Sequence, residues 1–156
     1  MIHISIPPNQ ELYLSYLCLD LNGTISTSGE LIAGVAERLA ELSKHMSIHV
    51  ITADTNGNAA LLIRDIPLSL HLVGKNNQGE GKLHFIQTLG EKNCVCMGNG
   101  HNDRLMLRNA GLSVGIMGAE GMAATALAAV DIVLSDINNA LDLLLFPNRL
   151  IATLRD

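Results

Sequence analysis

Apolar residues follow two different spacings along this chain, and the two spacings alternate. Short apolar runs that end at turn residues predict strands at positions 2–6, 14–20, 47–52, 68–73, 93–97, 112–116 and 132–134. Stretches with apolar residues at helical spacing predict helices at positions 31–44, 58–64, 78–89, 102–109, 121–129, 137–145 and 149–155. Strands that alternate with helices are typical of a mainly parallel sheet with helices on both faces. The expected fold class is therefore α/β, with three layers.

This expected fold also indicates where a functional site would lie. Open parallel sheets bind ligands outside the carboxyl ends of their strands. Asp20, Thr52 and Asn99 each fall at, or just past, the end of a predicted strand. The strand predictions did not depend on these polar residues, so their shared position makes them candidates for one site.

The first candidate segment runs from Asp20 to Thr24. An aspartate at a strand end, followed by the turn Asn22-Gly23-Thr24, places a carboxylate beside exposed backbone N–H groups. Such a turn can hold a phosphoryl group, and a carboxylate can attack phosphorus to form an aspartyl phosphate. Taken alone, Asp20 could equally well open a turn and do nothing else.

Three further positions could complete such a site. Thr52 could donate a hydrogen bond to a phosphoryl oxygen, although threonines at strand ends are usually structural. Lys82 lies early in a predicted helix, where the dipole disfavours a cation unless an anion is near; a solvated surface lysine is the simpler interpretation. In the segment Gly98–Asp103 the glycines permit a tight turn. Asp103 could there help to hold a divalent cation, cap the next helix, or do both.

Together, these segments resemble the sequence motifs of the haloacid dehalogenase superfamily. Residues 20–24 resemble its DxDGT signature, Thr52 its Thr/Ser motif, Lys82 its lysine motif and residues 98–103 its GDGxND motif. The four occur in the family's order between residues 14 and 117. Residues 98–107 also resemble the corresponding region of P-type ATPases, whose phosphorylated loop is DKTGT. The resemblance implies a Rossmann-like fold and a soluble relative of that phosphorylation domain.

The resemblance also implies a Mg²⁺ site and its ligands. Asp20 would be both the nucleophile and a metal ligand, and the backbone carbonyl of Asn22 would be a second ligand. Asn99 and Asp103 would complete the magnesium shell, directly or through water.

The remaining implied roles concern the phosphoryl group of a phosphorylated substrate, whose identity the sequence does not reveal. Asn22, Thr52 and the backbone amides around Gly23 and Ala53 would hold this group. Lys82 would neutralise charge between the nucleophile and the phosphoryl oxygens. Positioning and charge neutralisation are what phosphoryl transfer mainly requires. The expected activity is that of a phosphohydrolase or phosphotransferase.

Two residues depart from the family pattern. Hydrolytic members carry an aspartate where Asn22 stands, and that aspartate acts as general acid and base, which is worth about 10²–10⁴ in rate. P-type ATPases, with threonine there, hold long-lived aspartyl phosphates. We therefore expect Asp20 to accept a phosphoryl group from a donor with a good leaving group and to lose it slowly. Asn99 replaces a metal-binding aspartate, which should weaken Mg²⁺ binding because the amide brings no charge.

The sequence leaves no room for a cap domain. Many family members insert one after the first motif or before the lysine motif, but here only residues 25–30 and 74–81 are available. We expect a single domain over residues 1–156. Capless relatives tend to use macromolecular substrates or a lid from a neighbouring subunit, so a homo-oligomer is compatible with the sequence.

Composition narrows the partners and the compartment. The net charge is −5 and no cluster of Lys and Arg stands out, which disfavours a nucleic-acid binder. The apolar stretches are too short to span a membrane. Of the three cysteines, Cys94 and Cys96 form a CxC in a predicted strand, with both side chains on one face. Buried, reduced thiols are the expected state, and they suit a cytoplasmic protein.

Other functions remain open at this stage. Asp20 and Asp103 are the only carboxylates in the matched motifs, so a catalytically impaired binding or regulatory domain on the same fold is the main alternative. A phosphoacceptor receiver domain is disfavoured because its acceptor follows the third strand. A dinucleotide-binding module is disfavoured because no GxGxxG follows a strand. His101 could supply a proton, but a bystander is the simpler interpretation.

Overall fold

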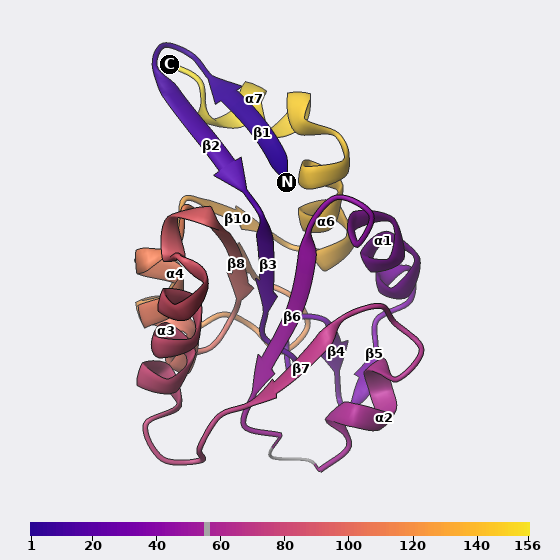
Figure 1. Ribbon diagram of the computed structural model, residues 1–156. Helices are drawn as coiled ribbons and strands as arrows, with labels where there is room; N and C mark the ends of the chain where they lie inside the picture. Colours follow the sequence, from indigo (N-terminus) through magenta and orange to yellow (C-terminus); the bar gives the residue numbers. More distant parts are fainter. Residues whose placement is uncertain (55–56) are drawn as a thin grey trace.

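The computed structural model describes residues 1–54 and 57–156, and within them six strands form a parallel central sheet (Figure 1). The strand order is β10-β9-β8-β3-β6-β7, and every neighbouring pair runs parallel. The strands are β3 (Tyr16–Leu19), β6 (Ser47–Thr52), β7 (Ser69–Leu72), β8 (Cys94–Gly98), β9 (Leu112–Ile116) and β10 (Ile132–Leu134). The predicted α/β class is confirmed.

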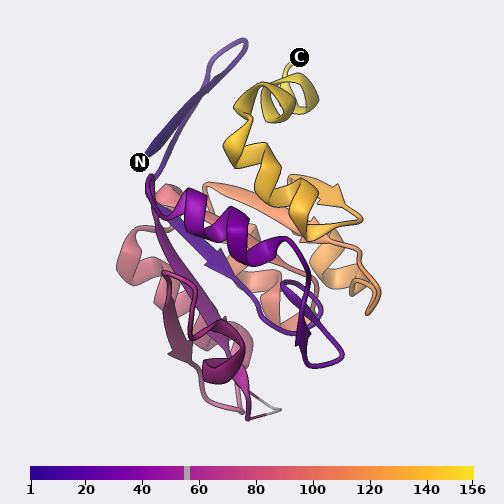
Figure 2. The same cartoon turned by 90° about the vertical axis from the view of Figure 1, so that its right-hand side faces the viewer.

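Helices cover both faces of this sheet and make the outer two layers (Figures 1 and 2). One face carries α3 (Gln78–Leu89), α4 (Arg104–Asn109) and α5 (Ala124–Leu127). The other carries α1 (Val35–Leu42), α2 (Ala59–Ile63) and α6 (Ile137–Leu145), and α7 (Pro147–Leu154) continues from α6. Helix α3 packs against α4, and α1 packs against α6. The three-layer arrangement is as predicted.

The two faces of the sheet have different cores. On the side of α1 and α6 the core is aliphatic, with Leu17, Leu19 and Val50 among its buried strand residues. On the side of α3 and α4 the smaller core contains all three cysteines. Cys18 and Cys96 are paired across neighbouring strands, and all three cysteines are buried free thiols, as the sequence predicted.

Strand and helix boundaries follow the predictions where periodicity is strong and differ where glycines or hairpins intervene. The predicted limits of β6, β9, β10, α3 and α6 match the structure. Helix α1 begins only at Val35, because β4 (Ser26–Thr27) and β5 (Glu30–Leu31) pair as a small hairpin. Gly34, which follows this hairpin, has φ +87°. Likewise Gly121 has φ +77°, which is incompatible with a right-handed helix, so α5 is shorter than predicted.

The N-terminal hairpin was predicted only in part, because the strand at Ile2–Ile6 was expected but its partner strand at Gln10–Leu14 was missed. Strand β1 (Ile2–Ile6) pairs antiparallel with β2 (Gln10–Leu14), so Leu14 ends this hairpin and does not begin the central strand. The hairpin projects from the amino-terminal end of the sheet and packs on α7 (Figure 2). Its alternating apolar residues, among them Ile4 and Ile6, join the aliphatic core.

No domain is inserted between the elements that carry the site. The connection from β3 to α1 contains only the β4–β5 hairpin, and residues 73–77 alone join β7 to α3. The structure is therefore capless at both positions, as predicted. Within the described ranges, no helix has the length and apolar character needed to cross a membrane. That the whole chain is one domain stays a prediction.

Candidate active site

Loops that follow three neighbouring strands meet at the carboxyl edge of the sheet. Strands β8, β3 and β6 are adjacent and parallel, so Asn99, Asp20 and Thr52 come together although they are far apart in sequence. A cavity of about 180 Å³ lies between these loops. It is lined by Asp20, Asn22, Thr52, Ala53, Gln78, Asn99, Gly100 and Asn102. Five of the predicted site residues thus share one cavity.

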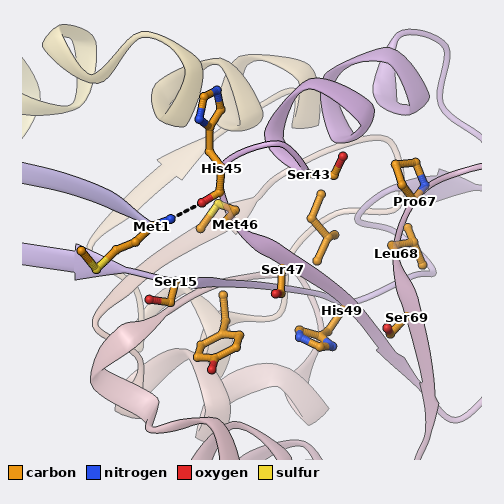
Figure 3. Close-up of a pocket in the computed structure, with 12 residues that line it drawn as sticks. Met1, Ser15, Ser43, His45, Met46, Ser47, His49, Pro67, Leu68 and Ser69 are labelled. Carbon is orange, nitrogen blue, oxygen red and sulfur yellow. Dashed lines mark hydrogen bonds between the residues drawn. The ribbon is translucent and has the colours of Figure 1, made fainter.

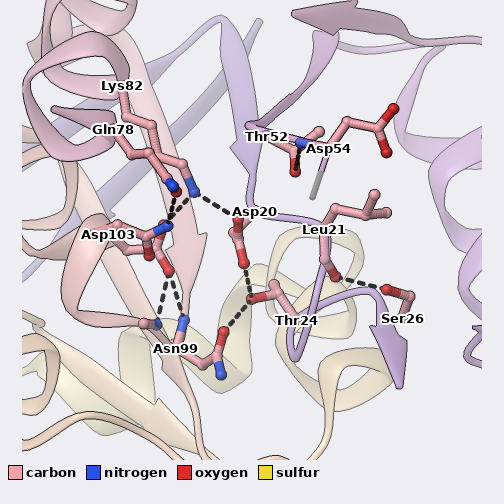
Figure 4. A network of polar contacts seen from close by, with 12 residues as sticks. Asp20, Leu21, Thr24, Ser26, Thr52, Asp54, Gln78, Lys82, Asn99 and Asp103 are labelled. Atoms are coloured by element: carbon pink, nitrogen blue, oxygen red, sulfur yellow. Dashed lines mark hydrogen bonds and ion pairs between the residues drawn. The ribbon is translucent and has the colours of Figure 1, made fainter. Parts of the chain in front are cut away.

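A buried network of three charges lies beside this cavity (Figure 4). The Lys82 ammonium, which has no solvent exposure, is 2.5 Å from Asp20 Oδ1 and 2.7 Å from Asp103 Oδ1. Helix α3 delivers this lysine, and the loop after β8 delivers Asp103. The alternative of a solvated surface lysine is therefore wrong. One cation between two carboxylates leaves the three groups with a net charge of −1 when all are ionised.

Asp103 also orders the loop that precedes it. Its second oxygen, Oδ2, accepts hydrogen bonds from the backbone amides of Asn99 at 3.0 Å and Gly100 at 2.8 Å. A Cβ at Gly98 would lie 2.6 Å from Asp103 Cγ, so that position requires glycine. Both carboxylate oxygens are thus engaged by protein groups. Asp103 is fully buried and lies behind the cavity, outside its lining.

Thr24 joins the other side of the Asp20 carboxylate to Asn99. Its hydroxyl lies 3.5 Å from Asp20 Oδ2 and 3.2 Å from Asn99 Oδ1, and its single hydrogen can serve one acceptor at a time. The amide nitrogen of Asn99 donates to the carbonyl of Gly121 at 3.0 Å. Asn99 is therefore held by both ends of its amide, with its oxygen directed at Thr24.

The turn at Gly23 is set by close packing against Asn99. Gly23 has φ +80°, and a Cβ there would lie 2.4 Å from the Asn99 amide nitrogen. Its own backbone amide donates to the carbonyl of Ser26 at 2.8 Å. This amide is thus already paired, and Gly23 does not line the cavity. The arrangement gives no support to the phosphate-binding role predicted for Gly23.

Thr52 and Ala53 line the opposite side of the cavity from a loop stiffened by Asp54. The Thr52 hydroxyl oxygen accepts the Asp54 amide at 3.1 Å, which leaves the hydroxyl hydrogen available for a ligand. The Asp54 carboxylate accepts the amides of Asn58 and Ala59, both at 3.0 Å, at the start of α2. Asp54 therefore connects the end of β6 to the start of α2 through hydrogen bonds.

Sequence analysis assigned no ligand-binding role to three residues of the cavity, which are Gln78 and, within the matched 98–103 motif, Gly100 and Asn102. Gln78 and Asn102 both line it, and the Asn102 side chain donates to Gln78 Oε1 at 2.7 Å. Gln78 precedes Lys82 by one helical turn, and this spacing could have indicated that the two share a face of α3. By contrast His101 is exposed, bonds to Thr125 at 2.7 Å and lies outside this cavity. This placement favours the bystander interpretation of His101.

The buried environment shifts the pKa values of the network. Burial, and then the negative charge of Asp103, raise the pKa of Asp20 to about 7, although Lys82 acts in the opposite direction. Burial acts to lower the pKa of Lys82, but the charges of Asp20 and Asp103 outweigh it and raise that pKa above its ordinary value. Lys82 is therefore a permanent cation at neutral pH, whereas Asp20 depends on its neighbours to remain ionised.

The donor set of this cavity fits a magnesium ion, though only weakly. The lining offers one carboxylate, Asp20, together with neutral oxygens of Asn22 and Asn99. Mg²⁺ prefers such oxygen ligands and keeps several waters of its own. Among residues 1–54 and 57–156 no group of three or more His, Cys, Asp or Glu residues could hold a metal ion. A cation here would therefore rely on one carboxylate, on neutral ligands and on water.

A larger cavity, of about 700 Å³, lies at the opposite end of the sheet (Figure 3). Its walls come from the starts of β3, β6 and β7 and include Ser15, Ser47, Ser69 and His49. The described residues that line it include no carboxylate and no lysine or arginine. Of these two cavities, only the one at the carboxyl edge therefore has charged side chains suited to phosphoryl transfer.

The sequence of this chain was compared with protein families and with known proteins. No family model matches the chain. It is 46% identical over 79 residues to the uncharacterised protein MJ0073 of Methanocaldococcus jannaschii, a match that covers 48% of this chain and 85% of that protein. The chain therefore belongs to the same family as MJ0073.

Solved structures identify the fold. The 3-deoxy-D-manno-octulosonate 8-phosphate phosphatase of Moraxella catarrhalis, solved with magnesium, phosphate and KDO, has a TM-score of 0.71 over 92% of this chain and 94% of that chain. The haloacid dehalogenase-like protein SP0104 of Streptococcus pneumoniae has a TM-score of 0.64 over 83% of this chain and 98% of that chain. This is the haloacid dehalogenase (HAD) fold. Sequence identities of 16% and 12% establish the HAD fold and nothing beyond it.

Proposed function

We propose that this HAD-fold protein is a magnesium-dependent phosphohydrolase or phosphotransferase that works through an aspartyl phosphate on Asp20. The observation that carries the proposal is the placement of Asp20, which lines the cavity while Lys82, itself paired with Asp103, binds its carboxylate. The similarity in fold to a phosphatase solved with magnesium and phosphate supports it.

In the first step, a carboxylate oxygen of Asp20 attacks the phosphorus of a phosphate monoester. The bond between phosphorus and the leaving-group oxygen breaks, and the released alkoxide or phenoxide takes a proton from water. In the second step, water attacks the aspartyl phosphate, the acyl phosphate P–O bond breaks, and phosphate leaves while the carboxylate is restored. In a transferase, the hydroxyl of a second substrate would replace this water.

The surrounding side chains position and neutralise the phosphoryl group. The Thr52 hydroxyl can donate to a phosphoryl oxygen, since its oxygen accepts the Asp54 amide and its hydrogen has no acceptor among the described residues. Lys82 keeps Asp20 ionised and offsets the negative charge that gathers around it. Asp20, Asn22 and Asn99 would hold the magnesium ion, with Asp103 acting through water or by orienting Lys82. When bound, the ion would supply positive charge to the phosphoryl oxygens.

Turnover is expected to be slow. An amide at Asn22 cannot exchange protons with the leaving group or with the attacking water. Asn99 brings no charge to the metal and spends its amide group on Thr24 and Gly121. The second step, which needs an activated water, should suffer more than the first when the donor has a good leaving group.

A catalytically impaired binding or regulatory domain is the second candidate, and the same two asparagines favour it. In that case phosphorylated ligands would enter the cavity without forming a covalent bond to Asp20. The two candidates differ in one observable, which is the phosphorylation of Asp20.

The first test is hydrolysis of para-nitrophenyl phosphate by fresh protein, with and without Mg²⁺, beside Asp20→Asn. Asp65→Asn, which removes an exposed carboxylate, is the control. We expect slow, magnesium-dependent hydrolysis that is lost in Asp20→Asn and kept in the control. Acid-quenched samples should gain the mass of one phosphoryl group, on a peptide that contains Asp20.

Restoring the family's acid–base residue gives a second test. Asn22→Asp should raise turnover by a factor of about 10²–10⁴ if proton transfer limits the wild-type protein. It should also shorten the lifetime of the phosphorylated form. Absence of hydrolysis and of phosphorylation in both proteins would reject the enzyme and leave the binding domain.

A further inference from the structure

A second cavity adjoins the proposed catalytic cavity. It has a volume of about 300 Å³ and lies between the start of α3 and the loop that leads into α4. Gln78 and Asn102 line both cavities, and their side chains are hydrogen-bonded to each other. The two cavities therefore meet at this bonded pair.

The second cavity has a positive character that the first lacks. Lys75 and Arg104 line it, and neither forms an ion pair within the described parts of the chain. Glu80 and His101 also line it, so two cations face one carboxylate when the imidazole is neutral. The surplus is one positive charge, in a protein whose net charge is −5.

The position of Arg104 indicates that an anion belongs here. Its guanidinium donates to the carbonyl of His101 at 2.9 Å, which fixes it against the first turn of α3. A Cβ at Gly79, in that turn, would lie 3.6 Å from Arg104 Nη1. The side chain of Asn77 does not cap this helix. Glu80 supplies the one carboxylate of this turn, but Arg104 and Lys75 bring two cations to the same cavity, so a further anion here would offset the surplus charge and be favoured by the helix dipole.

We infer that the substrate carries a second anionic group, besides the phosphoryl group that Asp20 attacks, and that Arg104 and Lys75 bind it in this second cavity. The inference rests on the proposed function, because it names the substrate class of that site. A surplus of one positive charge suits a single carboxylate well, and a second phosphate offers the same chemistry with more charge. Arg104 and Lys75 would then determine specificity without touching the reacting atoms.

Binding of phosphonates tests the inference without requiring turnover, because their C–P bond resists this hydrolysis. Phosphonoacetate, 3-phosphonopropionate and 4-phosphonobutyrate would be compared by calorimetry with methyl-, ethyl- and propylphosphonate, in the presence of Mg²⁺. At one chain length or more, the carboxylate should tighten binding about three- to tenfold, the range expected for an ion pair in a partly open cavity. Propane-1,3-diphosphonic acid provides the matching test for a second phosphate.

Three variants assign the effect to the second cavity. Arg104→Gln should abolish the gain from the second anion and leave binding of the simple alkylphosphonates unchanged. Because Arg104 also supports the His101 carbonyl, Lys75→Gln is needed as a second variant; its exposed side chain makes no hydrogen bond in the described structure, and its loss should reduce the gain. Arg108→Gln removes the same charge from an exposed position of α4 outside the cavity and should keep the full gain.

The possible outcomes separate this inference from the proposed function. A gain with the diphosphonate alone would support the second anionic site and assign it to phosphate. Equal binding of all paired phosphonates, or a gain that survives both Arg104→Gln and Lys75→Gln, would overturn the inference and leave the proposed function standing. If no phosphonate binds at all, both fail, since the catalytic cavity itself would not accept a phosphoryl-like group.

Discussion

Two polar clusters connect α3 to the sheet, and they differ in charge. At the carboxyl edge, Lys82 of α3 joins Asp20 and Asp103. Further along the same helix, Phe85 packs on a pair of imidazoles, with ring centroids 4.1 Å from His71 and 5.5 Å from His49. The first cluster is fully ionic and buried, whereas the second is aromatic and half-buried.

The imidazole pair shows what burial does without an opposite charge. His49 Nδ1 and His71 Nε2 are 3.0 Å apart, and the other ring nitrogen of His49 is buried with no hydrogen-bond partner. Burial lowers the pKa of both histidines, and the neighbouring His71 lowers that of His49 further. Both rings are therefore neutral at neutral pH. Buried polar groups keep their charge only where a group of opposite charge lies within contact, as Lys82 does for Asp20.

The largest effect should follow from removing the cation of the ionic cluster. Lys82→Met leaves two carboxylates buried against each other, which should cost about 3–5 kcal/mol in the free energy of unfolding. Urea denaturation at neutral pH measures it. Adding Asp103→Asn should recover part of the loss, because one of the two negative charges is then removed.

The matched control for this prediction is Lys92→Met. Lys92 is exposed and donates to the carbonyl of Asn109. Among the described residues it has no carboxylate as a hydrogen-bond partner. Its replacement should change stability little. A loss below about 1 kcal/mol in Lys82→Met would show that the ionic cluster is no more important than a surface ion pair.

A smaller loss of stability is expected when a carboxylate is added beside the ionic cluster, at Asn99. Asn99→Asp loses the hydrogen bond to the Gly121 carbonyl and sets an oxygen against that carbonyl. Without divalent ions this should cost about 1–3 kcal/mol in the free energy of unfolding. Mg²⁺ should return much of the loss, because the new carboxylate is a better ligand than the amide. Thermal unfolding in EDTA and in Mg²⁺ measures both effects.

Asn109→Asp is the matched control for Asn99→Asp. Asn109 also donates its amide to a backbone carbonyl, that of Leu105 at 2.8 Å, but it lies at the end of α4, outside the site. It should lose stability without any recovery in Mg²⁺. Equal recovery in both variants would mean that the ion acts on the protein as a whole and does not bind at Asn99.

The smallest effect is expected in the neutral cluster and depends on pH. The folded pKa values of His49 and His71 lie below their ordinary value of 6.5, so below that pH the unfolded chain binds more protons than the folded one. Their contribution to stability is therefore intact above pH 6.5 and is lost as the pH falls towards the folded pKa values. Over the range from about one pH unit above 6.5 to about one unit below, the two histidines should therefore lower the urea concentration at the unfolding midpoint. Asp20, whose pKa is raised to about 7, acts in the opposite direction over the same range.

The double variant His49→Gln/His71→Gln isolates this effect from other titrating groups. Its side chains stay neutral at every pH, so its urea midpoint should fall less than that of the wild-type protein over the same range. Identical pH dependence in the two proteins would show that other groups set the acid limb.

The sequence predicted the elements best where the signal is local. Helix α3 and strand β6 have the predicted limits because apolar periodicity within one element defines them. Strand β1 was predicted, but β2 was missed because it is stabilised by pairing with β1, which in turn packs on α7. Periodicity within one strand does not report such contacts. The start of α1 was misplaced for the same reason, since Leu31 pairs with Ser26.

In the candidate site, the motif resemblance identified Asp20, Thr52, Lys82 and Asp103, and the structure brings all four to one edge of the sheet. It did not identify Gln78, and it assigned no ligand role to Asn102, which lies within the matched motif and bonds to Gln78 between the two cavities. Their roles depend on how α3 packs against the loop before α4. The sequence pattern within either segment does not predict this packing. The predicted compartment, oligomeric state and partners stay predictions.

By itself, the sequence determined which segments become strands and helices and which side chains end the strands, because these depend on neighbours a few residues away. Only the tertiary structure decided the charge of the site and which residues line its cavities. Lys82 is 62 residues from Asp20 and 21 from Asp103, yet all three share one buried contact. The second cavity likewise exists only where α3 and the loop before α4 pack together. Electrostatic energies depend on distance and burial in space, and both are set by the fold.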